Sequence, residues 1–147
     1  MKLTEFIWDR THTEIAKSRV GNKETALFVA NEAKRLMDPY VPAKNMILAQ
    51  NVRVYTEGAK GVVEYMSPHA HYQFTGVLYV DKKTGLGAFT NGEGLFWSRP
   101  GVSKIPTKQK LNYSTFRHPL ATSHWDKAML TARKTDLTAS VQRYINR

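Results

Sequence analysis

One stretch of the chain, VVEYMSPHAHYQFTG at residues 62–76, constrains the fold more than any other because it joins a strand pattern to a helix pattern. Residues 62–66 alternate with a period of two, which predicts a half-buried strand. Ser67 and Pro68 then favour the start of a short helix, and Gly76 favours its left-handed end. The stretch therefore predicts a strand that runs directly into one capped helix.

Large semi-polar side chains are concentrated in this predicted helix. Their density exceeds what a core requires, and it indicates a surface that meets another molecule. We predict that they shape the junction between helix and sheet and form part of a contact with another subunit or a partner. The predicted contact residues are Tyr65, His69, His71, Tyr72, Gln73 and Trp125.

Two helical patterns lie on either side of this stretch. Residues 23–37 repeat apolar side chains at the three-four spacing of an amphipathic helix. A second pattern begins at Thr122 or Ser123 and places Trp125, Ala132 and Ile145 on roughly one stripe, which predicts a long C-terminal helix. Both helices have an apolar face that must pack against something.

The strand signals complete the predicted fold class. Residues 46–56 alternate well enough for a strand, and a turn at residues 57–60 returns the chain as an antiparallel hairpin. The pattern therefore predicts an α+β fold, in which an antiparallel sheet packs against a long C-terminal helix and an N-terminal helix. At 147 residues the chain is expected to form a single domain over residues 1–147.

Residues 77–115 are predicted to be an insertion made of a hairpin and a basic loop. Asn91 and Gly92 stand between two apolar runs, which is a strong short-range signal for a hairpin. We expect a meander or extended hairpin over residues 77–97. Residues 99–117 are punctuated by proline, so we expect an irregular segment that covers the sheet or projects from it.

The charge of the chain favours polyanions or an acidic protein as partners. It has 22 Lys and Arg against 12 Asp and Glu, a formal net charge of +10. Residues 94–125 contain no acid at all. The predicted basic contact segment consists of Arg99, Lys104, Lys108, Lys110 and Arg117.

Several classes of protein receive no support from the sequence. There is no cysteine, so a disulfide framework and a thiolate metal site are both excluded. The first residues lack an apolar run, and no window approaches the ~20 apolar residues of a membrane span. No nucleophile elbow or phosphate-binding glycine loop is present. We expect no signal peptide, no membrane association, no cofactor and no enzymatic activity.

Two alternatives remain open. The basic segment with its interleaved aromatic residues is typical of a nucleic-acid-binding module, although such residues also anchor ordinary loops. His69 and His71, with His118 and His124, would supply nitrogen ligands for a histidine-metal enzyme. Two histidines at alternate positions of a helix diverge by about 200°, which makes this the weaker alternative.

Three sequence blocks together resemble a known family. They are MDPYVPAKNMILAQNVRVY, VVEYMSPHAHYQFTG and RHPLATSHWDKAM. Their order is similar to that in the minor capsid proteins of long-tailed bacteriophages, the tail-completion or neck group of head-tail connectors. The matching positions are Tyr40, Val41, Pro42 and Leu48, then Tyr65, Pro68, Ala70, Gln73 and Gly76, then His118, Pro119, Ala121, Thr122, Trp125 and Ala128.

The resemblance implies a structural virion protein without catalysis, located in the neck between head and tail and assembled in the host cytoplasm. It implies a homo-oligomeric ring, a hexamer, through whose lumen double-stranded DNA passes. The implied partners are adaptor or stopper connector proteins on one side and a tail terminator or tail tube protein on the other. A ring needs two unlike patches on each subunit, as a head-to-tail contact demands.

Overall fold

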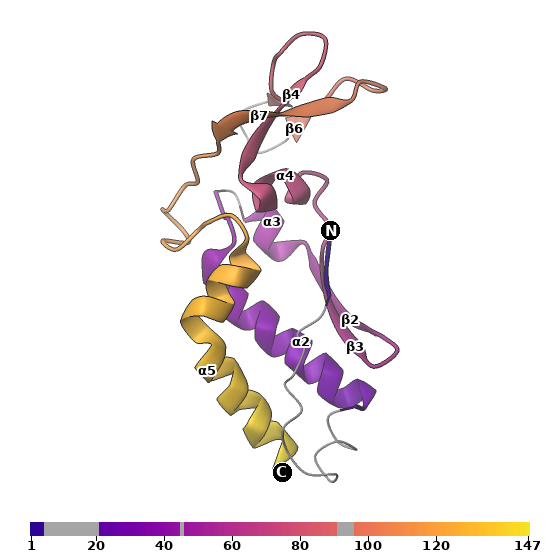
Figure 1. The fold of residues 1–147 in the computed structure, drawn as a ribbon, viewed down its shortest axis with the longest axis vertical. Coiled ribbons are helices and arrows are strands. Elements are labelled where there is room, and N and C mark those ends of the chain that lie inside the picture. The colour runs from indigo at the N-terminus through magenta and orange to yellow at the C-terminus, as the bar shows by residue number, and fades with distance from the viewer. Residues whose placement is uncertain (5–20, 45, 91–95) are drawn as a thin grey trace. The chain divides into compact units, whose positions relative to one another are not determined.

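The computed structural model describes residues 1–4, 21–44, 46–90 and 96–147, and it confirms the α+β class (Figure 1). The chain divides into two compact units, each assembled from separate segments. Unit 1 contains Met1–Asp38, Val52–Met66 and Asp126–Arg147, and unit 2 contains Pro39–Asn51 and Ser67–Trp125. The single domain expected from chain length stays a prediction. No helix among the described residues is long and apolar enough to span a bilayer.

Unit 1 contains an antiparallel sheet of three strands in the order β1-β3-β2. The strands are β1 (Lys2–Thr4), β2 (Val52–Glu57) and β3 (Lys60–Tyr65). β2 and β3 form the predicted hairpin, in which Val54 pairs with Val63. Its turn contains Gly58 with a φ of 61°, a conformation that costs glycine little.

The predicted N-terminal helix is confirmed as α2 (Lys23–Met37). The Asn22 side chain caps it, because its Oδ1 accepts a hydrogen bond of 2.8 Å from the Thr25 amide. The buried alanines Ala26, Ala30 and Ala33 lie along one face. Small side chains on that face allow α2 to pack closely against β3 of the sheet.

The long C-terminal helix is confirmed as α5 (Trp125–Ile145), which begins two or three residues later than expected. Arg133 has non-helical backbone angles (φ −127°, ψ 15°), so the helix is interrupted there. After the interruption the buried residues are Leu137, Val141 and Ile145, whereas Ala132, just before it, is exposed although the pattern placed it on the apolar stripe. Within unit 1 the last turns of α5 lie beside α2, since the rings of Phe28 and Tyr144 stack with centroids 4.1 Å apart (Figure 1).

Unit 2 contains short elements and two further antiparallel strand pairs. The 3-10 helix η1 (Asp38–Tyr40) leads into this unit. Strand β4 pairs with β7, and β5 pairs with β6. The elements are α3 (Ile47–Gln50), α4 (Ala70–Thr75), β4 (Val77–Asp81), β5 (Phe89–Thr90), β6 (Phe96–Trp97) and β7 (Lys104–Lys110).

The structure corrects the strand predicted over residues 46–56. Residues Ile47–Gln50 form the short helix α3, and the strand begins only at Val52. Leu48 and Ala49 are both buried, whereas a strand would point two consecutive side chains to opposite faces. Burial of this adjacent pair explains why the helical turn prevails.

The structure also corrects the start of the helix predicted at Ser67. The helix α4 begins at Ala70, with His69 as its N-cap residue. The Ser67 carbonyl accepts a hydrogen bond of 3.0 Å from the Ala70 amide, so a turn precedes the helix. The predicted end is confirmed, because Gly76 caps α4 with a φ of 72°.

The irregular structure expected for residues 99–117 is wrong in its central part. Lys104–Lys110 is a seven-residue strand, β7, which pairs with β4. Pro106 concealed the strand pattern, although proline is tolerated in an edge strand of this kind. The meander predicted over residues 77–97 is wrong in its first strand, because β4 pairs with β7. The strands β5 and β6 do pair with each other, as a hairpin would. Asn91 and Gly92 lie outside the described residues.

Candidate functional site

Two of the three sequence blocks that carry the resemblance meet at the start of unit 2. The Thr122 amide donates a hydrogen bond of 2.9 Å to the carbonyl of Tyr40. Next to it, the Nδ1 atom of His118 lies 2.8 Å from the carbonyl oxygen of Val41. Residues more than 70 positions apart are therefore held together by two adjacent hydrogen bonds.

The remaining block joins them at the end of α4. The Phe74 carbonyl accepts a hydrogen bond of 2.9 Å from the His124 amide, and the Phe74 ring meets Trp125 edge to face at 5.0 Å. The hydroxyl of Tyr113 donates to the Gln73 carbonyl at 2.6 Å, and burial raises the pKa of Tyr113. The three blocks thus build one junction.

The predicted contact residues fall into two groups. Tyr65 and Trp125 are 1% and 0% exposed, so they belong to the core and offer no surface to a partner in the isolated chain. This corrects the contact role assigned to them. His69 is half-buried, and burial lowers its pKa. His71 is exposed, while Tyr72 and Gln73 are half-buried, so the α4 surface remains a candidate contact.

The α4 surface is part of an aromatic and cationic cluster formed by His71, Tyr72, Tyr79 and Lys104. The rings of Tyr72 and Tyr79 lie 4.8 Å apart, and His71 lies 5.8 Å from Tyr72 and 6.2 Å from Tyr79. The Lys104 ammonium stands 5.4 Å from the centre of the Tyr72 ring. The cluster therefore joins residues from both predicted sets, the α4 aromatics and the basic segment.

Sequence reasoning missed Tyr79 as a member of this cluster. The sequence does not show which strand pairs with residues 77–80, so it does not show which face Tyr79 shares. The pairing of β4 with β7 places Tyr79 opposite Pro106 and beside Lys104. The sequence pattern that could have predicted this strand is the spacing of Lys104, Pro106 and Lys108 at every second position, because alternate residues of a strand share a face.

The five predicted basic residues have different environments. Lys104 is half-buried in the cluster, whereas Lys108, Lys110 and Arg117 are exposed. Arg99 is engaged with Asp81, to whose Oδ2 atom it donates hydrogen bonds of 2.9 Å from Nε and 2.8 Å from Nη2. The structure therefore gives Arg99 a partner within its own unit.

Asp81 is a buried carboxylate that organises the end of β4. Its Oδ1 atom accepts hydrogen bonds from the amides of Lys83 at 2.7 Å and Thr84 at 3.2 Å, which shape the following turn. Desolvation by burial opposes its ionisation, but the hydrogen bonds from Arg99 and the two amides outweigh this effect. The pKa of Asp81 is therefore below its ordinary value of 3.8.

This lowered pKa predicts a stability that depends on pH. A carboxyl group with a depressed pKa in the folded state stabilises the fold fully above its ordinary, unfolded pKa, and this contribution is lost as the pH falls through the folded value. The thermal midpoint of the native chain should fall more steeply below about pH 4 than that of the variant Asp81→Asn. Identical pH dependence in the two proteins, measured by circular dichroism, would contradict this role of Asp81.

Exposed apolar side chains are concentrated in unit 2. Six of the ten large apolar side chains that are exposed among the described residues lie within residues 86–120. Phe116 is 91% exposed and Trp97 is 52% exposed. The six are Leu86, Phe89, Trp97, Ile105, Phe116 and Leu120.

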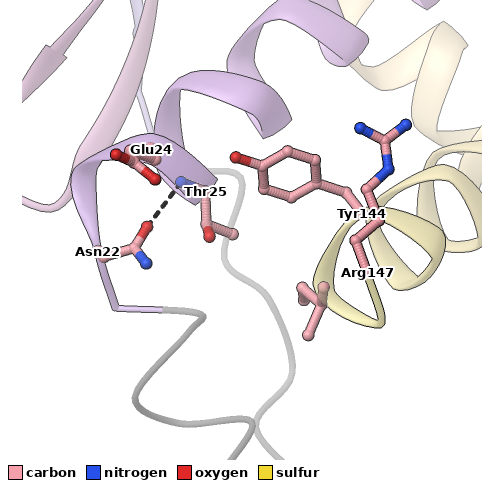
Figure 2. A pocket seen from close by; sticks show the side chains of 6 residues that line it. Asn22, Glu24, Thr25, Tyr144 and Arg147 are labelled. Carbon is pink, nitrogen blue, oxygen red and sulfur yellow. Dashed lines mark hydrogen bonds between the residues drawn. The ribbon is translucent and has the colours of Figure 1, made fainter.

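Unit 1 has a separate hollow of about 370 Å³ between the start of α2 and the end of α5 (Figure 2). Glu24 and Arg147, of opposite charge, lie on its lining with Tyr144. Asn22 and Thr25 also line it, but their hydrogen bond already forms the cap of α2. None of the residues predicted as functional lines this hollow.

The histidines of the metal alternative lie in unrelated surroundings. His124 packs on the Phe74 ring at 4.8 Å, His71 contacts two tyrosines, and His118 is placed at the Val41 carbonyl. Across the described parts of the chain, no three His, Asp or Glu side chains are grouped to hold a metal ion. The histidine-metal alternative receives no support from this arrangement.

The fold and the candidate site describe an α+β protein whose unit 2 exposes basic, aromatic and apolar side chains. Comparisons of the chain with protein-family profiles, with curated proteins and with solved structures find no match. The function must therefore be inferred from the residues of this chain and their geometry.

Proposed function

We propose that this chain is a structural virion protein that forms a ring in the neck of a tailed phage. In this role it joins the portal-proximal connector to the tail and surrounds the DNA channel. Its partners are other copies of itself, an adaptor or stopper connector protein, and a tail terminator or tail tube protein. The proposal includes no catalytic step and no cofactor.

The observation that carries the proposal is the set of exposed apolar side chains in residues 86–120. Isolated apolar residues are common on protein surfaces, but a concentration of them marks a surface that another protein covers. Phe116 in particular is almost fully exposed in the single chain. Aromatic side chains of this kind are enriched in protein interfaces.

A closing ring also requires that each subunit present two unlike patches. Unit 2 exposes apolar side chains, including Phe116 and Leu120, and basic side chains, including Lys108 and Lys110. These two sets of side chains differ in chemistry, as the two sides of a head-to-tail contact require. The three sequence blocks similar to neck proteins build the junction that supports this unit, which is consistent with the resemblance.

Native mass spectrometry over a series of protein concentrations tests the ring. We expect a closed oligomer of a single size, and a hexamer is the size implied by the resemblance. The variant Phe116→Ser/Leu120→Ser should lose the oligomer, because its subunits lack the apolar contact. The matched control Leu27→Ser/Leu130→Ser changes two exposed apolar residues of unit 1 and should keep it.

A native chain that stays monomeric at every concentration, or equal behaviour of the two double variants, would contradict the proposal. The alternative is a monomeric basic nucleic-acid-binding module, which the lysines of β7 favour. It predicts a monomer whose affinity for DNA falls steeply as salt rises. Oligomer size separates the two functions, because the neck protein should form a closed oligomer and the binding module should stay monomeric.

A further inference from the structure

The two-stranded sheet β4–β7 has two chemically different faces. In the register, Tyr79 pairs with Pro106, Asp81 with Lys104 and Val77 with Lys110. The irregularity between Val77 and Tyr79 leaves two extra residues in β7, so the register does not pair Lys108 with a residue of β4. One face therefore carries Tyr79, Lys104 and Lys110, and the exposed Lys108 lies between the two lysines in the irregular part of β7.

The aromatic cluster positions one of these lysines. The Lys104 ammonium stands over the Tyr72 ring at 5.4 Å, and Tyr79 packs against the same ring at 4.8 Å. A cation over an aromatic ring is held by the ring quadrupole, which restricts the lysine side chain before any ligand arrives. Because Lys104 and Tyr79 already contact Tyr72, its ring serves to orient the lysine rather than to stack on a base.

This face has little negative charge to oppose the lysines. Unit 2 contains eight Lys and Arg residues and two acids, Asp81 and Glu93. Asp81 is the carboxylate that shares this face of β4, and both of its oxygens accept hydrogen bonds from Arg99 or from the following turn. The lysine face is therefore left with a net positive charge.

The choice of lysine favours one class of polyanion over another. Lysine is depleted at the core of protein interfaces, where arginine and aromatic residues are enriched. Lysine is common, by contrast, among the residues that contact the phosphates of nucleic acids. A row of lysines along one strand thus matches a phosphate backbone better than it matches an acidic protein.

We propose that the lysine face of β4–β7, formed by Lys104, Lys108 and Lys110, binds the phosphate backbone of nucleic acid without reading its sequence. Tyr72 and Tyr79 hold Lys104 in place for this contact. The inference does not rest on the proposed ring, because a monomer would show the same binding. It adds to the neck function a surface on which DNA would be contacted.

Fluorescence anisotropy with a labelled duplex and the corresponding single strand tests the proposal over a salt series. Each phosphate contact contributes a slope of about −0.9 to log K against log salt for duplex DNA and about −0.7 for a single strand. The variant Lys104→Gln/Lys108→Gln/Lys110→Gln should therefore reduce the slope by about 2.7 or about 2.1, respectively. For the duplex, a fourfold rise in salt then weakens the native chain about forty-fold more than the variant.

A matched control removes the same charge from unit 1. The variant Lys23→Gln/Lys127→Gln/Lys134→Gln changes three exposed lysines on α2 and α5 and should leave the slope unchanged. If the triple variant of β7 does not fold, the double variant Lys108→Gln/Lys110→Gln alters only exposed side chains and should lower the duplex slope by about 1.8.

A second pair of variants tests the aromatic support. Tyr72→Leu removes the ring beneath Lys104 and should weaken binding by about two- to five-fold, the contribution of an exposed cation–π contact. Tyr72→Phe keeps the ring and should bind as the native chain does. Equal binding by the two variants would show that the ring does not position Lys104.

Three results would overturn the proposal of a nucleic-acid face. The first is that the native chain binds neither oligonucleotide. The second is that the β7 variant keeps the salt slope of the native chain, and the third is that the unit 1 control loses as much of this slope as the β7 variant. Competition by poly-L-glutamate at equal charge, as effective as competition by DNA, would assign the lysine face to an acidic protein instead. None of these results bears on the oligomeric state, which native mass spectrometry measures separately.

Discussion

Replacement of Trp125 by alanine is expected to lower the free energy of unfolding by about 3–5 kcal/mol, the range for removal of a large buried aromatic side chain. Trp125 is 0% exposed and meets the Phe74 ring edge to face at 5.0 Å. Its loss would leave a cavity where the last residues of unit 2 pack against α4. Chemical denaturation followed by circular dichroism measures the change.

The matched control for this prediction is Trp97→Ala. Trp97 is 52% exposed, so the same chemical change removes little buried surface and should shift stability by no more than about 0.5 kcal/mol. Equal losses in the two variants would show that Trp125 is not part of the core.

A second large effect is expected from Gly61→Ala in β3. A Cβ atom at this position would lie 2.3 Å from the carbonyl oxygen of Ala26 and 2.8 Å from the Cβ of Ala30. The first obstruction is backbone of α2, which cannot rotate away, so strand and helix must separate. We expect a loss of about 3 kcal/mol, the upper part of the range for overpacked cores.

Gly87→Ala is the control for Gly61→Ala. A Cβ atom at Gly87 would meet only the Leu78 Cδ1 atom, at an ordinary contact distance of 3.8 Å. The control should therefore change the thermal midpoint very little. If Gly61→Ala is tolerated equally well, the close packing of α2 on β3 does not exist in solution.

The parts of the fold that the sequence predicted are those in which local signals and packing agree. The helix α2 shows the three-four spacing along its whole length, and its buried alanines lie on the expected face. The β2–β3 hairpin follows from alternation on both sides of a glycine turn. Gly76 ends α4 because the left-handed conformation there suits glycine.

The errors arise where distant parts of the chain decide the local structure. β7 becomes a strand because β4 pairs with it across more than 20 residues of sequence, which no local pattern containing Pro106 reveals. α3 forms because Leu48 and Ala49 are both buried. The phase of α5 changes at Arg133, a break that the apolar stripe did not indicate.

The candidate site was predictable from the sequence in its separate residues but not in their contacts. Tyr72 and Lys104 were singled out separately, one for its aromatic neighbourhood and one for its charge, but their contact depends on the pairing of β4 with β7. The ion pair of Arg99 with Asp81 was not foreseen either, since 18 residues separate the two in sequence. Composition predicted the chemistry of the surface residues, but the contacts among these residues depend on the fold.

Single-particle electron microscopy of the assembled protein is the sharpest test of the proposed ring. We expect closed rings in which residues 86–120 of each copy, including Trp97 and Phe116, are covered by a neighbouring copy or by another virion protein. Particles that remain single chains, or rings in which these side chains face open solvent, would contradict it.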